Sequence, residues 1–357
     1  MARGQRVETC NAHRPSAVAV GRRKSDRLSR RVHPPRHRPS LDNGLIVLRT
    51  AVSSLLRKIW SIAQRGATAL RAKLGRSCHR PPAWEADVVD DIAFNRPWNI
   101  AVKLLRVQAR IRKRSLRPGP TIVVVNWNTL AVTQDTLHAV RALTPSDVTI
   151  MVVDNGSIDG SKSWLRSQEG LRKVFLPANA GHAIALDIAV LLARTKVVVT
   201  LDSDAVPLRV GWLDTVLDPM AQDGIILAGL RSSRDFVHPV FSAVDVRSFI
   251  DRNLSFQVYR DPGVTDEAVV WGTNSWDTGE LMTARVGNQE VVLVDPTDNP
   301  VGGLPGMTTG GVVYHHGGVT RSTEGAATDS EQESYQLWRA ALEQILPAAA
   351  LRPADEG

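Results

Sequence analysis

After Pro120, short runs of valine and isoleucine alternate with stretches of helical spacing, and this alternation constrains the fold more than any other feature of the chain. The apolar runs are expected to be strands at 121–125, 148–153, 173–176 and 197–201. Helices are expected between them at 133–143, 161–168 and 182–193. Near-continuous apolar strands separated by helices are typical of a mostly parallel sheet with helices on both faces. The sequence therefore predicts a doubly wound α/β fold.

The charge of the chain is divided between two parts. Overall, 44 Lys and Arg against 36 Asp and Glu give a net charge of +8. Residues 1–117 hold 27 basic and 7 acidic side chains, a net +20, whereas 118–357 hold 17 and 29, a net −12. A basic arm thus precedes an acidic body, and the charge of the body argues against a nucleic acid as its main partner.

The basic part is expected to contain two regions. Residues 1–44 are rich in Arg, Pro and Ser and poor in large apolar side chains, which predicts a disordered tail. Residues 45–117 are expected to form a basic, amphipathic helical arm. Within 45–76 there is no acidic residue, and apolar side chains recur at helical spacing beside seven Arg and Lys. This composition favours contact with an anionic membrane surface; a helix packed on the body and translation from an early start codon are the alternatives.

The stretch SLRPGP at 115–120 is expected to be a linker, because Pro and Gly interrupt helices. The body then spans 118–345, followed by a disordered tail at 346–357. Both cysteines, Cys10 and Cys78, precede the body, which therefore contains no disulfide or thiolate metal site. No apolar run is long enough to predict a membrane-spanning helix. A cytoplasmic setting is expected, at the cytoplasmic face of a membrane if the arm binds lipid.

Polar residues follow three of the four expected strands. Asn126 to Asn128 follow the first strand, Asp154 to Gly160 the second, and Asp202 to Asp204 the fourth. In sheets of this kind ligands bind beyond the carboxyl ends of the strands. These positions are therefore the candidates for a binding site.

Four motifs stand in order in this region: VVVNWN, VVDNGSIDGS, NAGHAIALDIAV and LDSDAVP. Their order and intervals resemble the nucleotide-sugar-binding half of family 2 glycosyltransferases. The resemblance covers about residues 120–325 and implies the GT-A fold, which is Rossmann-like. It also implies a hexosyl- or deoxyhexosyltransferase whose donor is a nucleotide-diphospho-sugar.

A divalent cation held by carboxylates neutralises the phosphates of such a donor, and oxygen ligands suit Mg²⁺ or Mn²⁺. Asp202 and Asp204 are two residues apart, on one side of an extended segment. The family's DXD motif implies that Asp204 is a metal ligand and that Asp202 lies at the ribose. A plain turn after a strand, where Asp and Ser are common, is the alternative.

The resemblance also implies the residues that bind the donor. Asp154 would hydrogen-bond the nucleobase, and Asn126 and Asn128 would line the same pocket. Asn179 and Gly181 open the next helix, whose N–H groups would face the diphosphate.

An inverting transferase needs a general base, and a carboxylate is the usual one. The Glu-Asp pair of many family members is absent, and Asp277 resembles an Asp-Thr-Gly variant of that site. Asp277 is therefore the candidate base, with Glu280 as the alternate. A helix cap formed by Asp277 and Glu280 is the structural alternative.

His315 and His316 follow a short apolar run, and such a histidine resembles the third metal ligand of several GT-A enzymes. Because successive side chains of a strand point to opposite faces, one of the two is expected to bind the metal. Arg321 would contact the diphosphate through charge-assisted hydrogen bonds.

The motifs together predict a metal-dependent inverting glycosyltransferase that uses Mn²⁺ or Mg²⁺ and acts on a glycan or lipid-linked acceptor. One alternative is a nucleotidyltransferase of similar architecture, which would need a glycine-rich phosphate loop after the first strand; Asn126 to Thr129 do not form one. The other is a catalytically silent protein that binds polyanions through its arm.

Overall fold

A computed structural model describes residues 83–257, 277–317 and 329–351, all within one compact unit, Val52–Gly357. The side chains of 83–97 and 329–331 are not described. The predicted tail at 1–44 and the amphipathic region at 45–76 lie outside the described residues.

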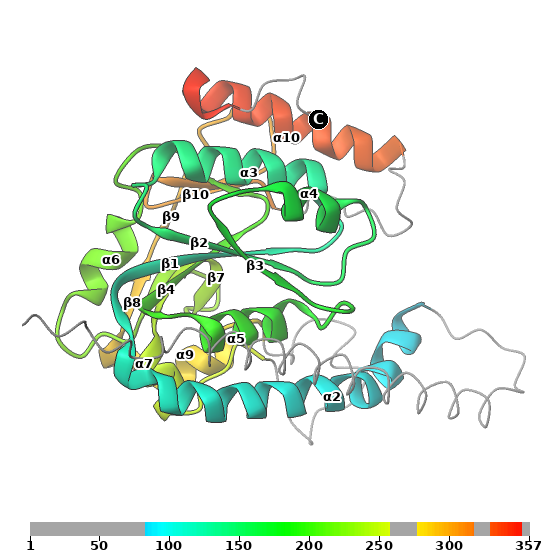
Figure 1. Ribbon diagram of the computed structural model, residues 1–357. Coiled ribbons are helices and arrows are strands. Elements are labelled where there is room, and N and C mark those ends of the chain that lie inside the picture. The colour runs from blue at the N-terminus through cyan, green and yellow to red at the C-terminus, as the bar shows by residue number, and fades with distance from the viewer. Residues whose placement is uncertain (1–82, 258–276, 318–328, 352–357) are drawn as a thin grey trace, which may run out of the picture. The chain divides into compact units, whose positions relative to one another are not determined.

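A seven-stranded mixed sheet forms the centre of the described chain, in the order β3-β2-β1-β4-β7-β6-β8 (Figure 1). Four of its pairings are parallel, including those of β1 with β2 and β4, while β7 runs antiparallel to both β4 and β6. The strands are β1 (Arg117–Asn126), β2 (Thr149–Asp154), β3 (Leu171–Phe175), β4 (Thr195–Asp202), β6 (Leu227–Arg231), β7 (Val237–Asp245) and β8 (Val291–Val294). The predicted α/β class with a mostly parallel sheet is confirmed.

A second, four-stranded sheet has the order β5-β11-β10-β9 and is antiparallel throughout. Its strands are β5 (Ala205–Pro207), β9 (Pro296–Thr297), β10 (Met307–Thr309) and β11 (Val313–His315). Because β5 starts three residues after β4 ends, the two sheets meet at the carboxyl end of β4.

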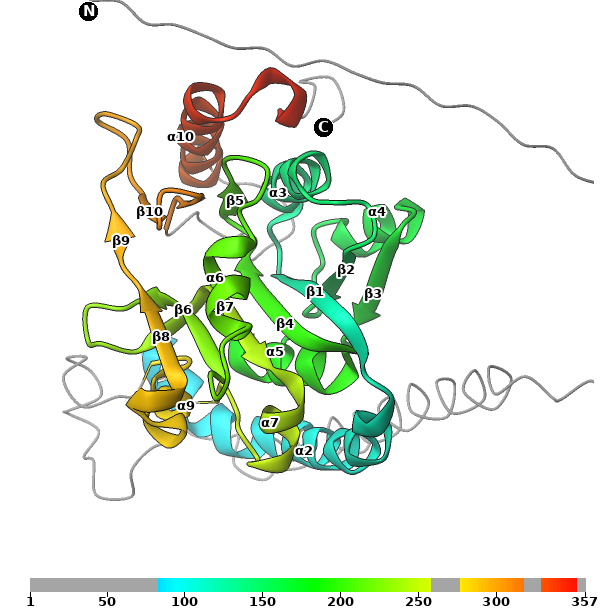
Figure 2. The same cartoon turned by 90° about the vertical axis from the view of Figure 1, so that its left-hand side faces the viewer.

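Helices cover both faces of the large sheet. On one face lie α3 (Leu130–Leu143), α4 (Ser161–Ser167) and α10 (Asp329–Ile345), and on the other α2 (Ala83–Arg112), α5 (His182–Leu192), α7 (Val246–Asp251) and α9 (Glu280–Val286) (Figure 1). The helix α6 (Asp214–Met220) lies beside β6 and β7, and three short 3-10 turns are Lys113–Ser115, Asn288–Glu290 and Ala348–Ala350. Figure 2, turned by 90°, shows α3 and α2 on opposite sides of the strands.

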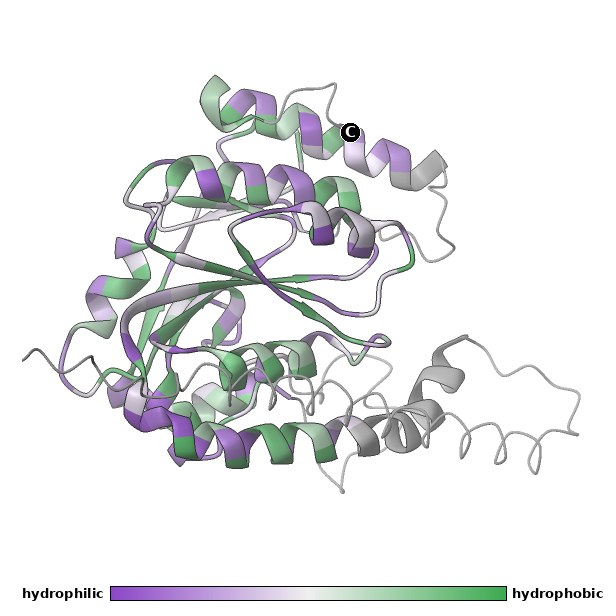
Figure 3. Cartoon of the chain, viewed as in Figure 1, coloured by the Kyte–Doolittle hydropathy of each residue, from purple (hydrophilic) through white to green (hydrophobic). Residues whose placement is uncertain are grey.

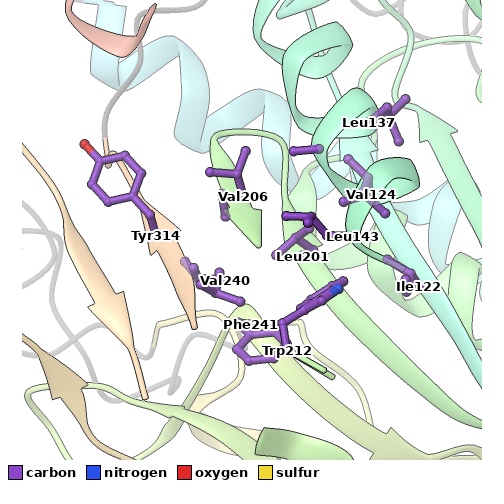
Figure 4. Packing of buried hydrophobic residues seen from close by; sticks show 14 of the residues in the cluster. Ile122, Val124, Leu137, Leu143, Leu201, Val206, Trp212, Val240, Phe241 and Tyr314 are labelled. Atoms are coloured by element: carbon purple, nitrogen blue, oxygen red, sulfur yellow. The ribbon is translucent and has the colours of Figure 1, made fainter. Parts of the chain in front are cut away.

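Each face of the sheet has its own apolar core, because side chains of a buried strand alternate between the two faces. Ile122 and Val124 of β1 belong to the core under α3, and Val123 and Val125 to the core under α5. In the first core Trp212 is fully buried, its ring centroid 5.4 Å from that of Phe241 (Figure 4). Trp212 is therefore a core residue.

The prediction of a linker at 115–120 is wrong, because residues 117–120 form the beginning of β1. Arg117 pairs with Thr195 and Pro120 with Val197, and Gly119 accommodates the irregularity between them with φ 84°. Preceding it, α2 packs on the body through Trp98, Val102, Leu105 and Ala109. The predicted limits of the domains stay a prediction.

At the other end of the body, Leu346 and Ala350 are buried in the core under α3 although they belong to the predicted tail 346–357. Residues 352–357 lie outside the described part.

Candidate active site

A pocket of about 150 Å³ opens at the carboxyl ends of β1, β2 and β4. Its lining comes from all four of the predicted motifs, and the residues are Val125, Trp127, Asn155, Asn179, Gly181, His182, Asp202, Ser203 and Asp204. The predicted donor residues Asn179, Gly181 and Asp202 and the predicted metal ligand Asp204 therefore share one pocket.

Asp202, Asp204 and His315 form a cluster in which one ligand atom of each lies within 4.8 Å of the others. Asp202 ends β4, Asp204 precedes β5, and His315 ends β11. The strand register explains the meeting, because β11 pairs with β5 so that His315 faces Ala205. The Nε2 atom of His315 lies 3.4 Å from Asp204 Oδ1. Two carboxylates and an imidazole are a donor set that suits Mn²⁺.

The structure distinguishes the two histidines. His316 is 4% exposed, and its Nδ1 lies 2.9 Å from the hydroxyl of Tyr314. Its ring meets the Trp338 ring edge-on on the α10 side. Because Tyr314 and His316 are two residues apart, they share the face opposite to that of His315. His315 is therefore the one that joins the two carboxylates.

The carboxylates also determine the pKa of His315. Burial by itself would lower this pKa, but the hydrogen bond with Asp204 and the charges of Asp204 and Asp202 outweigh it, so the pKa is raised. Burial lowers the pKa of His316 despite the charge of Asp204.

His182 adds a second imidazole beside the cluster. Its Nε2 lies 3.4 Å from Asp202 Oδ1 and is buried, yet within the described part of the chain it makes no hydrogen bond. A buried polar atom that makes no hydrogen bond on the wall of a pocket fits a site that completes its contacts with a ligand.

Asn126, Asn128 and Asp154 are buried below the pocket and have partners within the protein. Asn126 donates from Nδ2 to Asp154 Oδ2 and to the Ser157 hydroxyl, both at 3.0 Å. Asn128, at φ 53°, accepts the Ile158 N–H at 2.8 Å. All three bind the ends of β1 and β2 to each other, and none of them lines the pocket. Their predicted contacts with the donor stay a prediction.

The residues missed by the sequence reasoning lie in the same motifs. Trp127 and Asn155 line the pocket next to the predicted Asn126 and Asp154, and Ser203 lies between the two aspartates. Asn155 also accepts the Ala180 N–H at 2.8 Å, which joins the second motif to the third. The four motifs indicated the segments in which these side chains lie. Nothing in the sequence indicates which residue of each motif faces the pocket.

Asp277 and Glu280 lie at the start of α9. The Glu280 carboxylate accepts the Asp277 N–H at 2.8 Å and pairs with Arg234 at 2.9 Å. The N-cap residue of α9 is Gly279, and no side chain caps the helix there. The Asp277 side chain is 50% exposed. Burial lowers the pKa of His238, and the charges of Asp202 and Asp277 both oppose this. Asp277 is not among the residues that line the pocket, so its predicted role as the base stays a prediction.

Arg321 lies outside the described residues, so its predicted contact with the diphosphate stays a prediction. Among the helices that the structure describes, none combines the length and apolarity needed to cross a membrane.

Part of the chain matches a known family. Residues 121–258 match the family described as Glycosyl transferase family 2. The matched segment starts within β1, and its four predicted motifs include Asp202 and Asp204. No curated protein matches the chain.

Several solved structures are similar at low identity. A mannosyltransferase of Pyrobaculum calidifontis in complex with GDP-Man and Mn²⁺ has 18% identity over 57% of this chain, with a TM-score of 0.40. The chain covers 65% of that enzyme, which is less than two thirds of its length. A glucosyl-3-phosphoglycerate synthase of Mycobacterium tuberculosis in complex with Mn²⁺ and UDP has 15% identity, covering 68% of this chain and 85% of that one, with a TM-score of 0.37. TarS of S. aureus has 14% identity, covering 64% and 67%, with a TM-score of 0.38.

Proposed function

We propose that this protein is a metal-dependent, inverting glycosyltransferase that moves a sugar from a nucleotide-diphosphate donor to a glycan or lipid-linked acceptor. The observation that carries the proposal is the cluster of Asp202, Asp204 and His315, whose two carboxylates line the pocket of the segment that matches family 2. Two carboxylates and an imidazole whose ligand atoms lie within 4.8 Å of one another fit a divalent cation.

In this proposal Asp204 and His315 hold Mn²⁺ or Mg²⁺, and Asp202 contacts the ribose. When bound, the cation neutralises the charge that develops on the diphosphate as it leaves. Asn179 and the N–H groups at the start of α5 orient the diphosphate, because free N–H groups at a helix N-terminus attract anions. Trp127 and Asn155 exclude water from the donor.

Asp277 acts as the base that takes the proton of the acceptor hydroxyl, with Glu280 as the alternate. Two features support this role: the half-exposed Asp277 carboxylate is accessible, and Glu280 is held by Arg234. A single base opposite the leaving group inverts the sugar carbon in one displacement. The contact with Glu280 is compatible with this role, because it uses the backbone N–H of Asp277 and not its carboxylate.

The remaining proposals concern the acceptor and the setting. A lipid-linked acceptor is consistent with the basic residues 45–76, which we propose hold the enzyme at the cytoplasmic face of an anionic membrane.

Binding of Mn²⁺ and transfer from a panel of UDP-, GDP- and dTDP-sugars test the proposal. Calorimetry is expected to show Mn²⁺ binding that Asp204→Ala weakens more than about 100-fold, since even partners outside the metal ligands contribute 10- to 100-fold. Asp223→Ala, which removes an exposed carboxylate, is the matched control. Equal Mn²⁺ affinity in the wild type and Asp204→Ala would refute the metal site. Retention of the anomeric configuration in the product would refute the inverting mechanism.

A further inference from the structure

From Trp98 onwards, where its side chains are described, the helix α2 has two apolar faces, one buried and one exposed. Trp98, Val102, Leu105 and Ala109 pack in the core with α5. A second set points outward, and its members are Ile100 (50% exposed), Leu104 (42%), Val107 (55%) and Ile111 (78%). We refer to these four as the outer stripe.

The outer stripe is continuous along the helix. Its members are spaced by four, three and four residues, which keeps them on one side over about 16 Å at 1.5 Å per residue. They are half of the eight large apolar side chains that are exposed in the described part of the chain. Figure 3 shows hydrophobic segments recurring along α2. A contiguous exposed apolar stripe of this kind marks an interaction surface.

Cationic side chains border the outer stripe. Lys103 and Arg110 are exposed on α2, and Arg114 is exposed in the turn that follows it. At 100° per residue Lys103 and Arg110 lie within about 80° of the stripe, along the same edge. No Asp or Glu occurs between Trp98 and Arg117. At the end of the neighbouring α7, Asp251 pairs with Lys113, and Asn253, two residues beyond the helix, accepts a hydrogen bond from Arg110.

This charge decides among the three candidate occupants. Residues 45–76 of the same chain are apolar enough to cover the stripe, but they carry seven cations and no acidic residue, so they would add like charge. A second copy centred on the outer stripe would likewise bring Lys103 and Arg110 to their counterparts, because the acidic residues of α2, Glu85, Asp87, Asp90 and Asp91, all precede the stripe. An anionic surface with an apolar interior complements both the stripe and its border.

We propose that the outer face of α2 docks on an anionic lipid bilayer. Ile100, Leu104, Val107 and Ile111 insert at the boundary of headgroups and acyl chains, and Lys103, Arg110 and Arg114 contact the phosphates. This surface is separate from the residues 45–76 and independent of the transferase chemistry.

Flotation of the full chain with lipid vesicles tests the proposal. Vesicles of phosphatidylcholine with 30% phosphatidylglycerol are compared with phosphatidylcholine alone. The double variant Leu104→Gln/Ile111→Gln is expected to lower partition into the anionic vesicles about 10- to 30-fold, as expected when two half-exposed aliphatic side chains no longer insert. The double variant Lys103→Gln/Arg110→Gln is expected to lower partition into the anionic vesicles about 10- to 30-fold at low salt. This reduction should be smaller at high salt, which screens the attraction between the cations and the lipid phosphates.

Val210→Gln is the matched control, because Val210 is 71% exposed and lies outside α2. It is expected to bind vesicles like the wild type, and none of the variants is expected to change the thermal unfolding midpoint. Wild-type partition of the Leu104→Gln/Ile111→Gln variant would overturn the proposal. Equal binding to both vesicle types would overturn it as well. A dimer of the wild type in solution that this double variant dissociates would assign the stripe to a second copy instead.

Discussion

Asp135 is expected to be the residue on which the packing of α10 against α3 depends most. It lies on α3, 1% exposed, and accepts hydrogen bonds from Tyr335 and Trp338 at 3.1 Å and from Arg339 at 2.9 Å. All three donors belong to α10, about 200 residues away in sequence. Asp135→Ala removes the acceptor of all three at once.

The size of the effect follows from the burial. Truncating one partner of a buried ion pair costs about 3–5 kcal/mol, because charge and N–H donors then remain in the core without their acceptor. The Arg339 side chain is 19% exposed, so water recovers part of its solvation and about 3 kcal/mol is the better figure. At about 2–4 °C per kcal/mol for a protein of this size, the thermal midpoint is expected to fall by roughly 6–12 °C.

Urea unfolding followed by tryptophan fluorescence measures this change. Trp338→Phe keeps a ring stacked near Tyr314 but removes the N–H donor, and it is expected to cost about 1 kcal/mol. The double mutant should then cost less than the sum of the two changes, by about 1 kcal/mol. Asp147→Asn, an exposed carboxylate, is the control and should stay within about 0.5 kcal/mol of the wild type. Two results would contradict the proposed role of Asp135. One is that the losses of unfolding free energy in the two single mutants add fully in the double mutant. The other is a loss below about 1 kcal/mol in Asp135→Ala.

Two further predictions concern a turn and a buried carboxyl. Gly156 has φ +85° and a Cβ there would lie 2.3 Å from the Ala178 carbonyl carbon, so Gly156→Ala should lower the free energy of unfolding by about 2–4 kcal/mol. In urea unfolding, Gly170→Ala, at φ +72° with nothing within 4 Å, is expected to lose only about 1 kcal/mol, and equal losses would disprove the steric cause. Burial raises the pKa of Asp187 above 3.8, against opposing hydrogen bonds from Gln257, Ser255 and Phe256 and the charge of Arg106. The folded chain therefore keeps a proton that the unfolded chain releases, and stability is lost as pH rises from about 4 towards the raised pKa. Asp187→Asn lacks this loss, so its free energy of unfolding relative to that of the wild type should increase with pH between 4 and 8. Urea unfolding at a series of pH values measures this difference. A difference that stays constant over this pH range would exclude the effect.

The first half of the body could be predicted from the sequence because its signals are local. The apolar run at 121–125 is long, continuous and β-branched, and β1 indeed includes it. The helix expected at 182–193 is observed at His182–Leu192. A buried parallel strand needs an apolar sequence on both faces, so the sequence itself carries the information. For the same reason Asp202 and Asp204 could be placed at a strand end.

The second half was less predictable because its structure depends on distant contacts. The strands β5, β10 and β11 have three residues each, too short for a periodic pattern. Asn126 shows a second limit of prediction from sequence. A polar residue at a strand end can contact a ligand, or it can form hydrogen bonds within the protein. The Asn126 amide is used inside the protein, by Asp154 and Ser157, and no sequence pattern distinguishes the two cases.

The choice between His315 and His316 illustrates how the two halves combine. Alternation along β11 required one of the two to face the carboxylates, but the sequence did not indicate which one. The pairing of His315 with Ala205 gives the answer, and the other face of β11 is fixed by Tyr314, which stacks on Trp338 of α10. Since Trp338 in turn donates to Asp135, a helix more than 100 residues before β11 helps to fix its orientation. The two carboxylates of the cluster are therefore placed by a local strand end, whereas its imidazole depends on a chain of contacts through α10.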